Sequence, residues 1–399
     1  MNHIPAKVNQ RSGFSLIELL VSIAVLSLIM LMVFQMLERT QSTWKKSRDS
    51  VAEYKDARVG FEAITRRLSQ ATLAPFWSYT KNGSSSTAIA SKFDRNSDLH
   101  YVSGPASTIM LSPPPNAGPR VTHCMFFQAP TGYSEAVTTA NTLKYGNFPN
   151  MLNSWGYYVE FGTDLADRPA YINSLDNAPR TRARYRLIEY CQPTEGLQIY
   201  AENLRSPNKT SLSPSALYNW FLNNAKYGCN CPNNYPSGSA SSDTLDDRTI
   251  RLVAENIIAL VILPSESQAK EYRDDLAPNY FYDSRAWQSS NSSKAGGQVQ
   301  IDKMRHALPP IVEVIMVAVD EADFNRYALN RKIDSVAGFN DCNFTNNLFL
   351  TANKYDEDLA TLKNTLNSFE PEIKHRVFRA SVRLREAKWG GFVKSTATN

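Results

Sequence analysis

Glu18 is the residue that most constrains the chemistry of this chain, because it places a carboxylate inside an apolar run. Between Phe14 and Phe34 it is the only charged side chain, and the apolar residues continue to Leu37. A run of this length can cross a bilayer core of about 30 Å as one helix. An ionised carboxylate in hydrocarbon is costly unless it is paired. We therefore expect Glu18 to have a positively charged partner.

A short basic segment, residues 1–13, precedes the apolar run. It contains Lys7 and Arg11 without any acidic residue, and it ends at Gly13. In a secretory signal peptide the apolar region lies before the cleavage site, so cleavage removes it. Here the order is reversed, and cleavage after Gly13 would leave the apolar helix on the mature chain.

This order of basic residues, Gly13, Phe14 and Glu18, followed by an apolar helix, resembles the prepilin-type leader of type IV pilins and type II secretion pseudopilins. The resemblance implies that prepilin peptidase, a membrane aspartyl peptidase, cuts after Gly13 and methylates the new amino terminus at Phe14. It implies other pilin or pseudopilin subunits as partners. It also implies a single-pass protein of the bacterial inner membrane, with its head in the periplasm or in an extracellular filament.

The resemblance also gives Glu18 a partner, the amino group of Phe14 on the same chain or on a neighbouring subunit. Low dielectric strengthens the attraction between the two charges. Such a pair would set the axial register of a helical stack of subunits. The alternative is that Glu18 lies near the membrane interface and reaches water by extending its side chain.

The helix is expected to continue beyond the membrane, because no Gly or Pro follows Leu37 until Gly60 and the next proline is Pro75. We expect a transmembrane part over residues 14–37 and an extracytoplasmic part over 38–74. An apolar stripe runs along one face of the outer part, with Arg58 in its one polar slot, and consists of Val51, Tyr54, Phe61, Ile64, Leu68 and Ala71. The stripe must pack on another element, unless this part is an independent amphipathic helix beside a linker.

Residues 75–399 read as a β-rich head with long loops. We expect strands over Leu99–Val102, Thr108–Leu111, Val121–Phe127, Trp155–Phe161, Arg182–Cys191 (half-exposed), Ile250–Leu263, Pro310–Val319 and Arg376–Leu384. Helices are expected over Pro214–Ala225, Glu321–Ile333 and Lys354–Phe369, and loops over residues 81–91, Ser112–Pro119, Cys229–Asp243 and Tyr280–Gly297.

Three stretches make the resemblance more specific: residues 57–72, Arg251–Pro264 and Leu308–Glu321. They are similar to the outer helix and the paired head segments of the J-type minor pseudopilins, and most similar to the Verru_Chthon cassette protein C family. The implied fold is α+β, a pilin-like fold with insertions, in which the long N-terminal helix packs on an antiparallel sheet.

Composition excludes some functions and leaves the redox state open. The formal net charge of +5 falls to +3 without Lys7 and Arg11, which is too weak to indicate nucleic-acid binding. Five cysteines follow the apolar run, namely Cys124, Cys191, Cys229, Cys231 and Cys342. We expect disulfides or free thiols rather than a metal site, because only His123 adjoins a cysteine.

No motif for catalysis or for a cofactor is apparent, so we expect neither an enzyme nor a metal site. The histidines are scattered and are expected to be structural: His100, His123, His306 and His375. The acidic clusters at Asp246-Asp247, Asp274-Asp275 and Asp320-Glu321-Asp323 lack calcium-loop spacing and read as solvated faces. Aromatic residues in the loops could form a ligand surface, namely Trp77, Tyr145, Tyr235, Tyr280, Phe281, Tyr282 and Trp287.

Two functions follow from the sequence. The first is a minor pilin or pseudopilin that is processed after Gly13 and assembled into a type IV pilus-like or type II secretion-like filament, at or near its tip. The second is a membrane-anchored adhesin or binding domain that uses the prepilin leader only for targeting.

Overall fold

The structure is a computed structural model in which helices and antiparallel strands form an α+β protein, as the sequence predicted. It describes residues 16–81, 89–110, 118–134, 148–163, 170–173, 175, 180–200, 214–225, 250–267, 273–286 and 303–387. The chain forms two compact units, Met1–Glu53 and Tyr54–Asn399.

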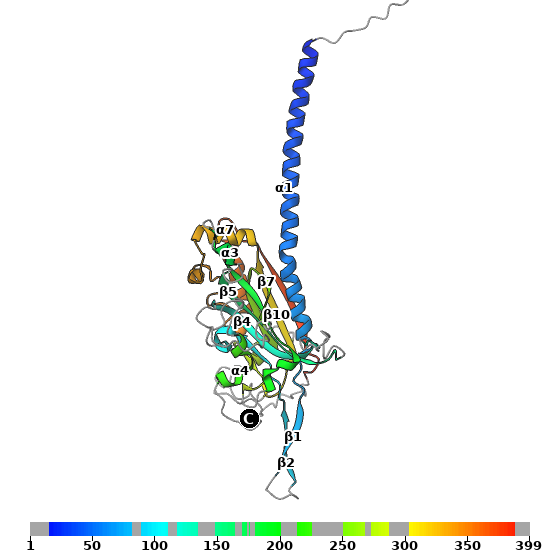
Figure 1. The fold of residues 1–399 in the computed structure, drawn as a ribbon, viewed down its shortest axis with the longest axis vertical. Helices are drawn as coiled ribbons and strands as arrows, with labels where there is room; N and C mark the ends of the chain where they lie inside the picture. The colour runs from blue at the N-terminus through cyan, green and yellow to red at the C-terminus, as the bar shows by residue number, and fades with distance from the viewer. Residues whose placement is uncertain are drawn as a thin grey trace, which may run out of the picture. The chain divides into compact units, whose positions relative to one another are not determined.

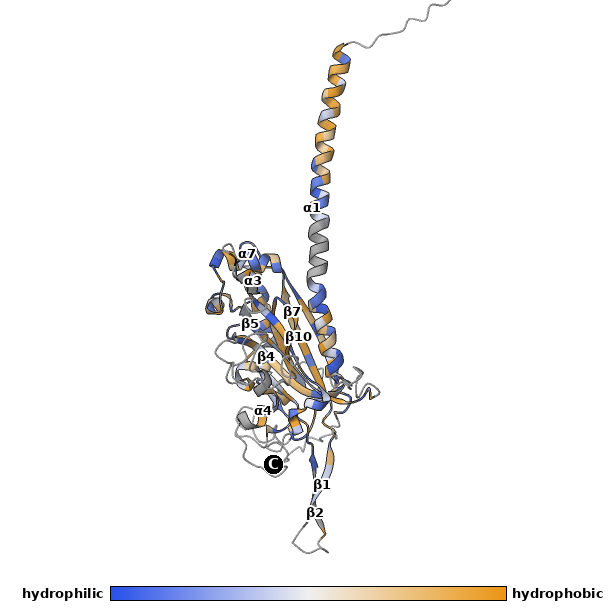
Figure 2. Cartoon of the chain, in the orientation of Figure 1, coloured by the Kyte–Doolittle hydropathy of each residue, from blue (hydrophilic) through white to orange (hydrophobic). Residues whose placement is uncertain are grey.

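The described part of the first unit is helical and belongs to α1 (Leu16–Leu68). Within its stretch Leu16–Trp44, the most apolar window of 18 residues has a mean hydropathy of 2.7, and none of that window is buried. In Figure 2 the ribbon of α1 is coloured hydrophobic along most of its N-terminal part and hydrophilic further along the helix. The stretch is therefore long and apolar enough to cross a membrane.

The last turns of α1 belong to the second unit and bury the predicted stripe there. Phe61, Ile64 and Leu68 are buried, whereas the Val51 side chain lies outside the described residues. Arg58 was predicted to occupy the one polar position of the stripe, and this prediction was wrong. That position is occupied by Ala57, which is only 3% exposed. The Arg58 side chain lies on the exposed side of the helix and pairs with Glu62 one turn later, at 2.8 Å.

Helix α1 ends at Leu68 rather than at the predicted Ala74. The amides of Gln70 and Ala71 donate to the carbonyls of Arg67 and Leu68, which tightens the last turn. The amide of Thr72 then donates to the carbonyl of Gln128 at 2.9 Å, so the backbone leaves the helix to pair with a strand. A strand pairing over a long sequence distance thus overrides the local helical pattern.

The larger sheet of the second unit has six antiparallel strands (Figure 1). In spatial order it consists of β7 (Ile250–Glu255), β6 (Ala183–Gln192), β5 (Leu152–Thr163), β4 (Arg120–Pro130), β3 (Val102–Pro105) and β9 (Tyr282–Asp283). Strand β6 was expected to be half-exposed, but all its residues are buried. Its charged side chains tolerate burial because Arg184 pairs with Glu255 and Glu321, and Glu189 pairs with Arg67.

The smaller sheet has three antiparallel strands in the order β11 (His375–Arg383), β10 (Ile311–Val319) and β8 (Ile257–Ser265). The predicted segment Ile250–Leu263 is confirmed as strand, but it forms β7 in one sheet and β8 in the other. Asn256 separates them with a φ of 61°, in the left-handed region that asparagine tolerates better than most residues. One residue therefore carries the chain from one sheet to the other.

Two local predictions were wrong. Thr108–Leu111 was predicted as a strand, but Ala106–Ile109 forms the short helix α2, in which the amide of Met110 donates to the carbonyl of Ala106 at 2.8 Å. The helix buries Ala106 and Ile109, which lie on one face. The strand predicted at Leu99–Val102 begins only at Val102, as β3.

A β-hairpin that the sequence analysis did not predict consists of β1 (Phe76–Lys81) and β2 (Ala90–Asn96). It forms a two-stranded sheet of its own, and Figure 1 shows it extending away from the two larger sheets. Its strands flank the predicted loop at residues 81–91, of which residues 82–88 lie outside the described part.

The three longer helices of the head confirm the predictions: α4 (Pro214–Ala225), α7 (Glu321–Arg331) and α9 (Tyr355–Asn367). The remaining helical turns are α3 (Ala170–Asn173), η1 (Thr194–Gly196), η2 (Gln198–Tyr200), α5 (Arg273–Leu276), η8 (Val336–Gly338), α8 (Phe339–Cys342) and η9 (Ala352–Lys354). The predicted loop Cys229–Asp243 lies outside the described residues.

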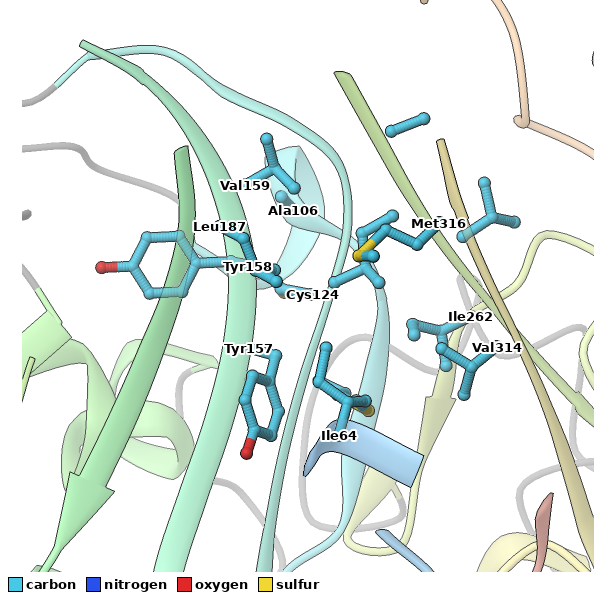
Figure 3. Close-up of a cluster of buried hydrophobic side chains, with 14 of the residues drawn as sticks. Ile64, Ala106, Cys124, Tyr157, Tyr158, Val159, Leu187, Ile262, Val314 and Met316 are labelled. Carbon is cyan, nitrogen blue, oxygen red and sulfur yellow. The ribbon is translucent and has the colours of Figure 1, made fainter. Parts of the chain in front are cut away.

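One continuous core joins α1 to both larger sheets. Figure 3 shows Ile64 of α1 beside Tyr157 of β5 and near Ile262 and Val314 of the smaller sheet. All four side chains are fully buried. The outer end of α1 is therefore part of the core of the head, which rejects the alternative of an independent helix beside a linker.

Candidate assembly site

Glu18 is the one predicted functional residue that lies within the described part of the chain. Lys7, Arg11, Gly13 and Phe14 lie outside it. Glu18 is exposed in the first turn of α1, where the positive end of the helix dipole favours a carboxylate. The helix dipole therefore stabilises the Glu18 carboxylate, in addition to any cationic group that pairs with it.

The hydroxyl groups of the apolar stretch are satisfied within the helix. Ser22 Oγ donates to the Glu18 carbonyl oxygen at 2.6 Å, and Ser27 Oγ donates to the Ile23 carbonyl oxygen. A hydroxyl that is hydrogen-bonded within its own helix can be placed in hydrocarbon at little cost in free energy. The Glu18 carboxylate differs from them because it carries a charge, which is costly in hydrocarbon.

At the other end of α1, Arg67 anchors the helix to the larger sheet. Its guanidinium lies 3.8 Å from the centre of the Trp155 ring and donates to the Tyr157 hydroxyl at 2.6 Å and to the Glu189 carboxylate. Burial alone lowers the pKa of Arg67, but the interactions with Tyr157 and Glu189 outweigh it and raise that pKa. The ion pair therefore keeps Arg67 charged at a half-buried position between α1 and the larger sheet.

Gly60 lets α1 approach the larger sheet closely. A Cβ atom at this position would lie 2.8 Å from Val253 Cγ1 and 3.4 Å from Leu187 Cδ2. The sequence analysis noted Gly60 only as a potential helix breaker. A glycine inside the apolar stripe was the signal for close packing, because glycine is otherwise unfavourable inside a helix.

Strand β4 covers one edge of the smaller sheet with side chains. The amide of Leu260 donates to Thr122 Oγ1 and the amide of Ile262 donates to His123 Nδ1, both at 3.0 Å. A bulge after Val121, with Thr122 at a φ of 54°, turns these side chains towards β8. The outward amides of β8 are thereby satisfied without a further strand.

His123 is a buried structural histidine, as predicted. Its Nδ1 accepts from Ile262, so its Nε2 carries the proton and donates to the Phe349 carbonyl oxygen at 3.0 Å. Burial lowers the pKa of His123 to about 4, although the backbone hydrogen bonds oppose this effect. The ring is therefore neutral at neutral pH.

His100 also has both ring nitrogens occupied. It donates from Nε2 to Asp283 at 2.7 Å and accepts at Nδ1 from the Trp220 indole at 3.1 Å. Tyr218 donates to the second Asp283 oxygen at 2.8 Å. Burial lowers the pKa of His100 despite Asp283. A catalytic histidine needs one nitrogen directed at a substrate, so this network reads as structural.

The cluster Asp320-Glu321-Asp323 is structural rather than a solvated face. Asp320 caps α7 by accepting from the Asp323 amide at 3.0 Å. Asp323 pairs with Arg326 at 3.0 Å, and Glu321 pairs with Arg184. Across the described residues, no group of three His, Cys, Asp or Glu side chains could hold a metal ion.

The described cysteines are free thiols. Cys124, Cys191 and Cys342 are all buried and unbridged, while Cys229 and Cys231 lie outside the described residues. Burial raises the pKa of Cys342 to about 12 and raises that of Cys124 further. The thiols of Cys124 and Cys342 are therefore protonated at neutral pH, and all three thiols are shielded by burial.

The predicted aromatic ligand surface is largely buried. Tyr280, Phe281 and Tyr282 belong to the core, whereas Trp77 on β1 is 71% exposed. Tyr145, Tyr235 and Trp287 lie outside the described residues. Further exposed aromatic side chains lie on the hairpin β1–β2, where Tyr79 and Phe93 are also more than half exposed.

Comparison with known proteins gives one match. The prokaryotic N-terminal methylation motif matches residues 8–34, a stretch that includes Gly13, Phe14 and Glu18. No curated protein and no solved structure matches the chain. The motif, together with the apolar helix, supports a type IV pilin-like protein that is anchored in a membrane by a single span.

Proposed function

We propose that this chain is a minor pilin or pseudopilin, which prepilin peptidase cuts between Gly13 and Phe14 and methylates at Phe14. The observation that carries the proposal is the methylation motif at residues 8–34, on a chain whose helix continues from the apolar stretch into the core of a β-rich head. The parts are a leader (1–13), a membrane helix (14–37), the outer part of that helix, and the head.

Glu18 pairs with the amino group of Phe14 on a neighbouring subunit. Removal of the leader creates that positive charge at the start of the apolar segment, one turn before Glu18. Each charge is costly in hydrocarbon, and the pair relieves both costs at one axial position only. Apolar contacts between helices change little when one helix slides along another. The ion pair therefore sets the axial register of the stacked subunits.

The head occupies the tip of a short filament outside the inner membrane. A large head suits the tip because no subunit lies above it. The sequence resemblance supports assignment to the J-type pseudopilins and to the Verru_Chthon cassette protein C family. It covers residues 57–72, Arg251–Pro264 and Leu308–Glu321. In the head these residues contribute the buried end of α1, β8 and β10.

Mass spectrometry of the mature amino terminus tests this function. The full chain is expressed with a prepilin peptidase and, in parallel, without one. We expect a chain that starts at N-methylated Phe14 only when the peptidase is present. Either an intact Met1 in both samples or an unmethylated start at another residue would refute the proposal.

One observation favours the second function, a membrane-anchored binding domain. The register of the hairpin pairs Tyr79 with Phe93 and places Trp77 two residues from Tyr79, so these three exposed side chains share one face. Such a face could hold a flat ligand such as a sugar ring. The full chain in detergent would then bind glycans in the absence of other pilin subunits, and Trp77→Ala would weaken that binding.

A further inference from the structure

The smaller sheet has one closed edge and one open edge. At the closed edge, Thr122 and His123 accept from the outward amides of β8. At the other edge, β11 pairs with β10 alone among the described residues. Residues along β11 are mostly exposed or half-buried. An edge strand of this kind offers a row of backbone donors and acceptors to another strand.

The open edge is strongly basic. From Lys374 to Arg385 the chain carries five Lys or Arg residues and neither Asp nor Glu. Arg376 and Arg383 are exposed, and Arg379 pairs with Glu313 of β10. Because side chains alternate along a strand, Arg376 lies on one face of the sheet and Arg379 and Arg383 lie on the other. Positive charge thus flanks the edge on both sides.

Residues before and after the strand are fixed, which presents the edge in an extended form. The Asp320 amide donates to the Lys374 carbonyl oxygen at 2.8 Å, and the Leu384 amide donates to the Pro310 carbonyl oxygen at 3.2 Å. On the inner face, the Phe378 ring lies 5.7 Å from that of Phe61 on α1. A partner therefore meets a preformed strand and does not have to order it.

We infer that β11 is a docking edge for an extended acidic segment of a partner protein, which adds to the smaller sheet as a fourth strand. The partner backbone pairs with β11, and its acidic side chains pair with Arg376 and Arg383. The positive charge of the arginines favours an acidic partner. The backbone donors and acceptors on the outer side of β11 favour a partner in extended form. Such a partner would be recruited whether or not the chain enters a filament.

A nucleic acid fits this surface less well. Its phosphates could pair with the arginines, but it cannot form a strand ladder with the backbone of β11. The arginines also lie on both sides of the edge and do not line one face, as phosphate recognition by a sheet surface requires. Duplex DNA is therefore included in the test as a competing ligand.

The test measures binding of a fluorescent synthetic peptide of repeated Glu-Glu-Val-Val units to the full chain in detergent, because an extended peptide of this pattern projects glutamates from both faces. We expect binding that weakens with added salt. A peptide with the same sequence but N-methylated at alternate amides cannot form a ladder and should not bind. A peptide with lysine in place of glutamate should not bind either.

The variant Arg376→Glu/Arg383→Glu should bind the acidic peptide at least about tenfold more weakly. The matched control Arg66→Glu/Arg331→Glu changes the net charge equally at exposed positions of α1 and α7 and should bind like the wild type. Unchanged circular dichroism of both variants would show that folding is preserved.

Several outcomes would overturn the inference. Absence of binding by the acidic peptide would identify the arginines as guards against edge pairing. Equal binding of the N-methylated peptide, or tighter binding of duplex DNA, would show attraction by charge without strand addition. Binding only after removal of residues 388–399 would show that the carboxyl-terminal segment of the same chain occupies the edge.

Discussion

Glu18 is set apart from the other polar residues of the apolar stretch by its charge. Replacing it with Ala or Gln removes that charge, while the helix and the cleavage site stay unchanged. We expect normal processing at Gly13 and loss of co-purification with other pilin subunits. Ser22→Ala is the matched control, because the Ser22 hydroxyl bonds only within its own helix. Co-purification of Glu18→Gln at the wild-type level would contradict the pairing mechanism.

Buried histidines make the stability of the head depend on pH. The pKa of His123 is lowered from 6.5 to about 4, and burial with nearby arginines lowers that of His306 to about 3. As the pH falls below about 6.5, the unfolded chain takes up protons that the folded chain does not. The contribution of the neutral histidines to stability is therefore fully present above that pH and is lost progressively towards pH 4. For His123 the loss is about 3 kcal/mol.

Urea unfolding of the full chain in detergent, near neutral pH and at about pH 5, checks this expectation. His123→Gln should reduce the loss of stability on acidification, although it lowers stability at neutral pH. Val59→Leu, at an exposed position without a titratable group, should keep the wild-type dependence. An identical pH dependence in the wild type and in His123→Gln would contradict the role of His123.

Among the elements, α1 depends most on a single small residue. Gly60→Leu should destabilise the head by about 2 kcal/mol, because its side chain would overlap Val253 and Leu187 and force the helix away from the sheet. Val59→Leu is the control, since Val59 is 58% exposed on the same turn. It should change the free energy of unfolding by less than about 0.5 kcal/mol. Equal urea midpoints for both variants would refute close packing at Gly60.

The sequence predicted those elements whose signals are local. Strand β10 has an apolar, β-branched pattern along its whole length, and α7 follows a capping aspartate, Asp320. The methylation motif is equally local, which explains why it could be recognised at residues 8–34 without a structure.

The remaining features depend on contacts between distant residues. The burial of β6 could not be predicted, because the partners of Arg184 and Glu189 come from distant segments, among them Glu255 and Arg67. The role of His123 depends on β8, which lies more than a hundred residues later in the chain. Helix α2 was mistaken for a strand because a single turn has too few residues to display a helical period.

At the scale of the molecule, the described cysteines predict the reactivity of the folded chain. In a variant with Cys229→Ser and Cys231→Ser, only Cys124, Cys191 and Cys342 remain. Because these thiols are buried, we expect no labelling of the native chain by a thiol reagent and three labels after denaturation. Mass spectrometry counts the labels. Labelling of the native chain would show that the core opens readily.

The capped edge of β8 has a consequence for the order in which the protein can form. One side of β8 needs Thr122 and His123, and the other needs β10, which ends at Val319. Neither the early nor the late part of the head can complete the core alone. Folding therefore waits for most of the chain to emerge, and it is expected to be slow because its decisive contacts join distant residues. A chaperone that holds the emerging chain would act in this interval.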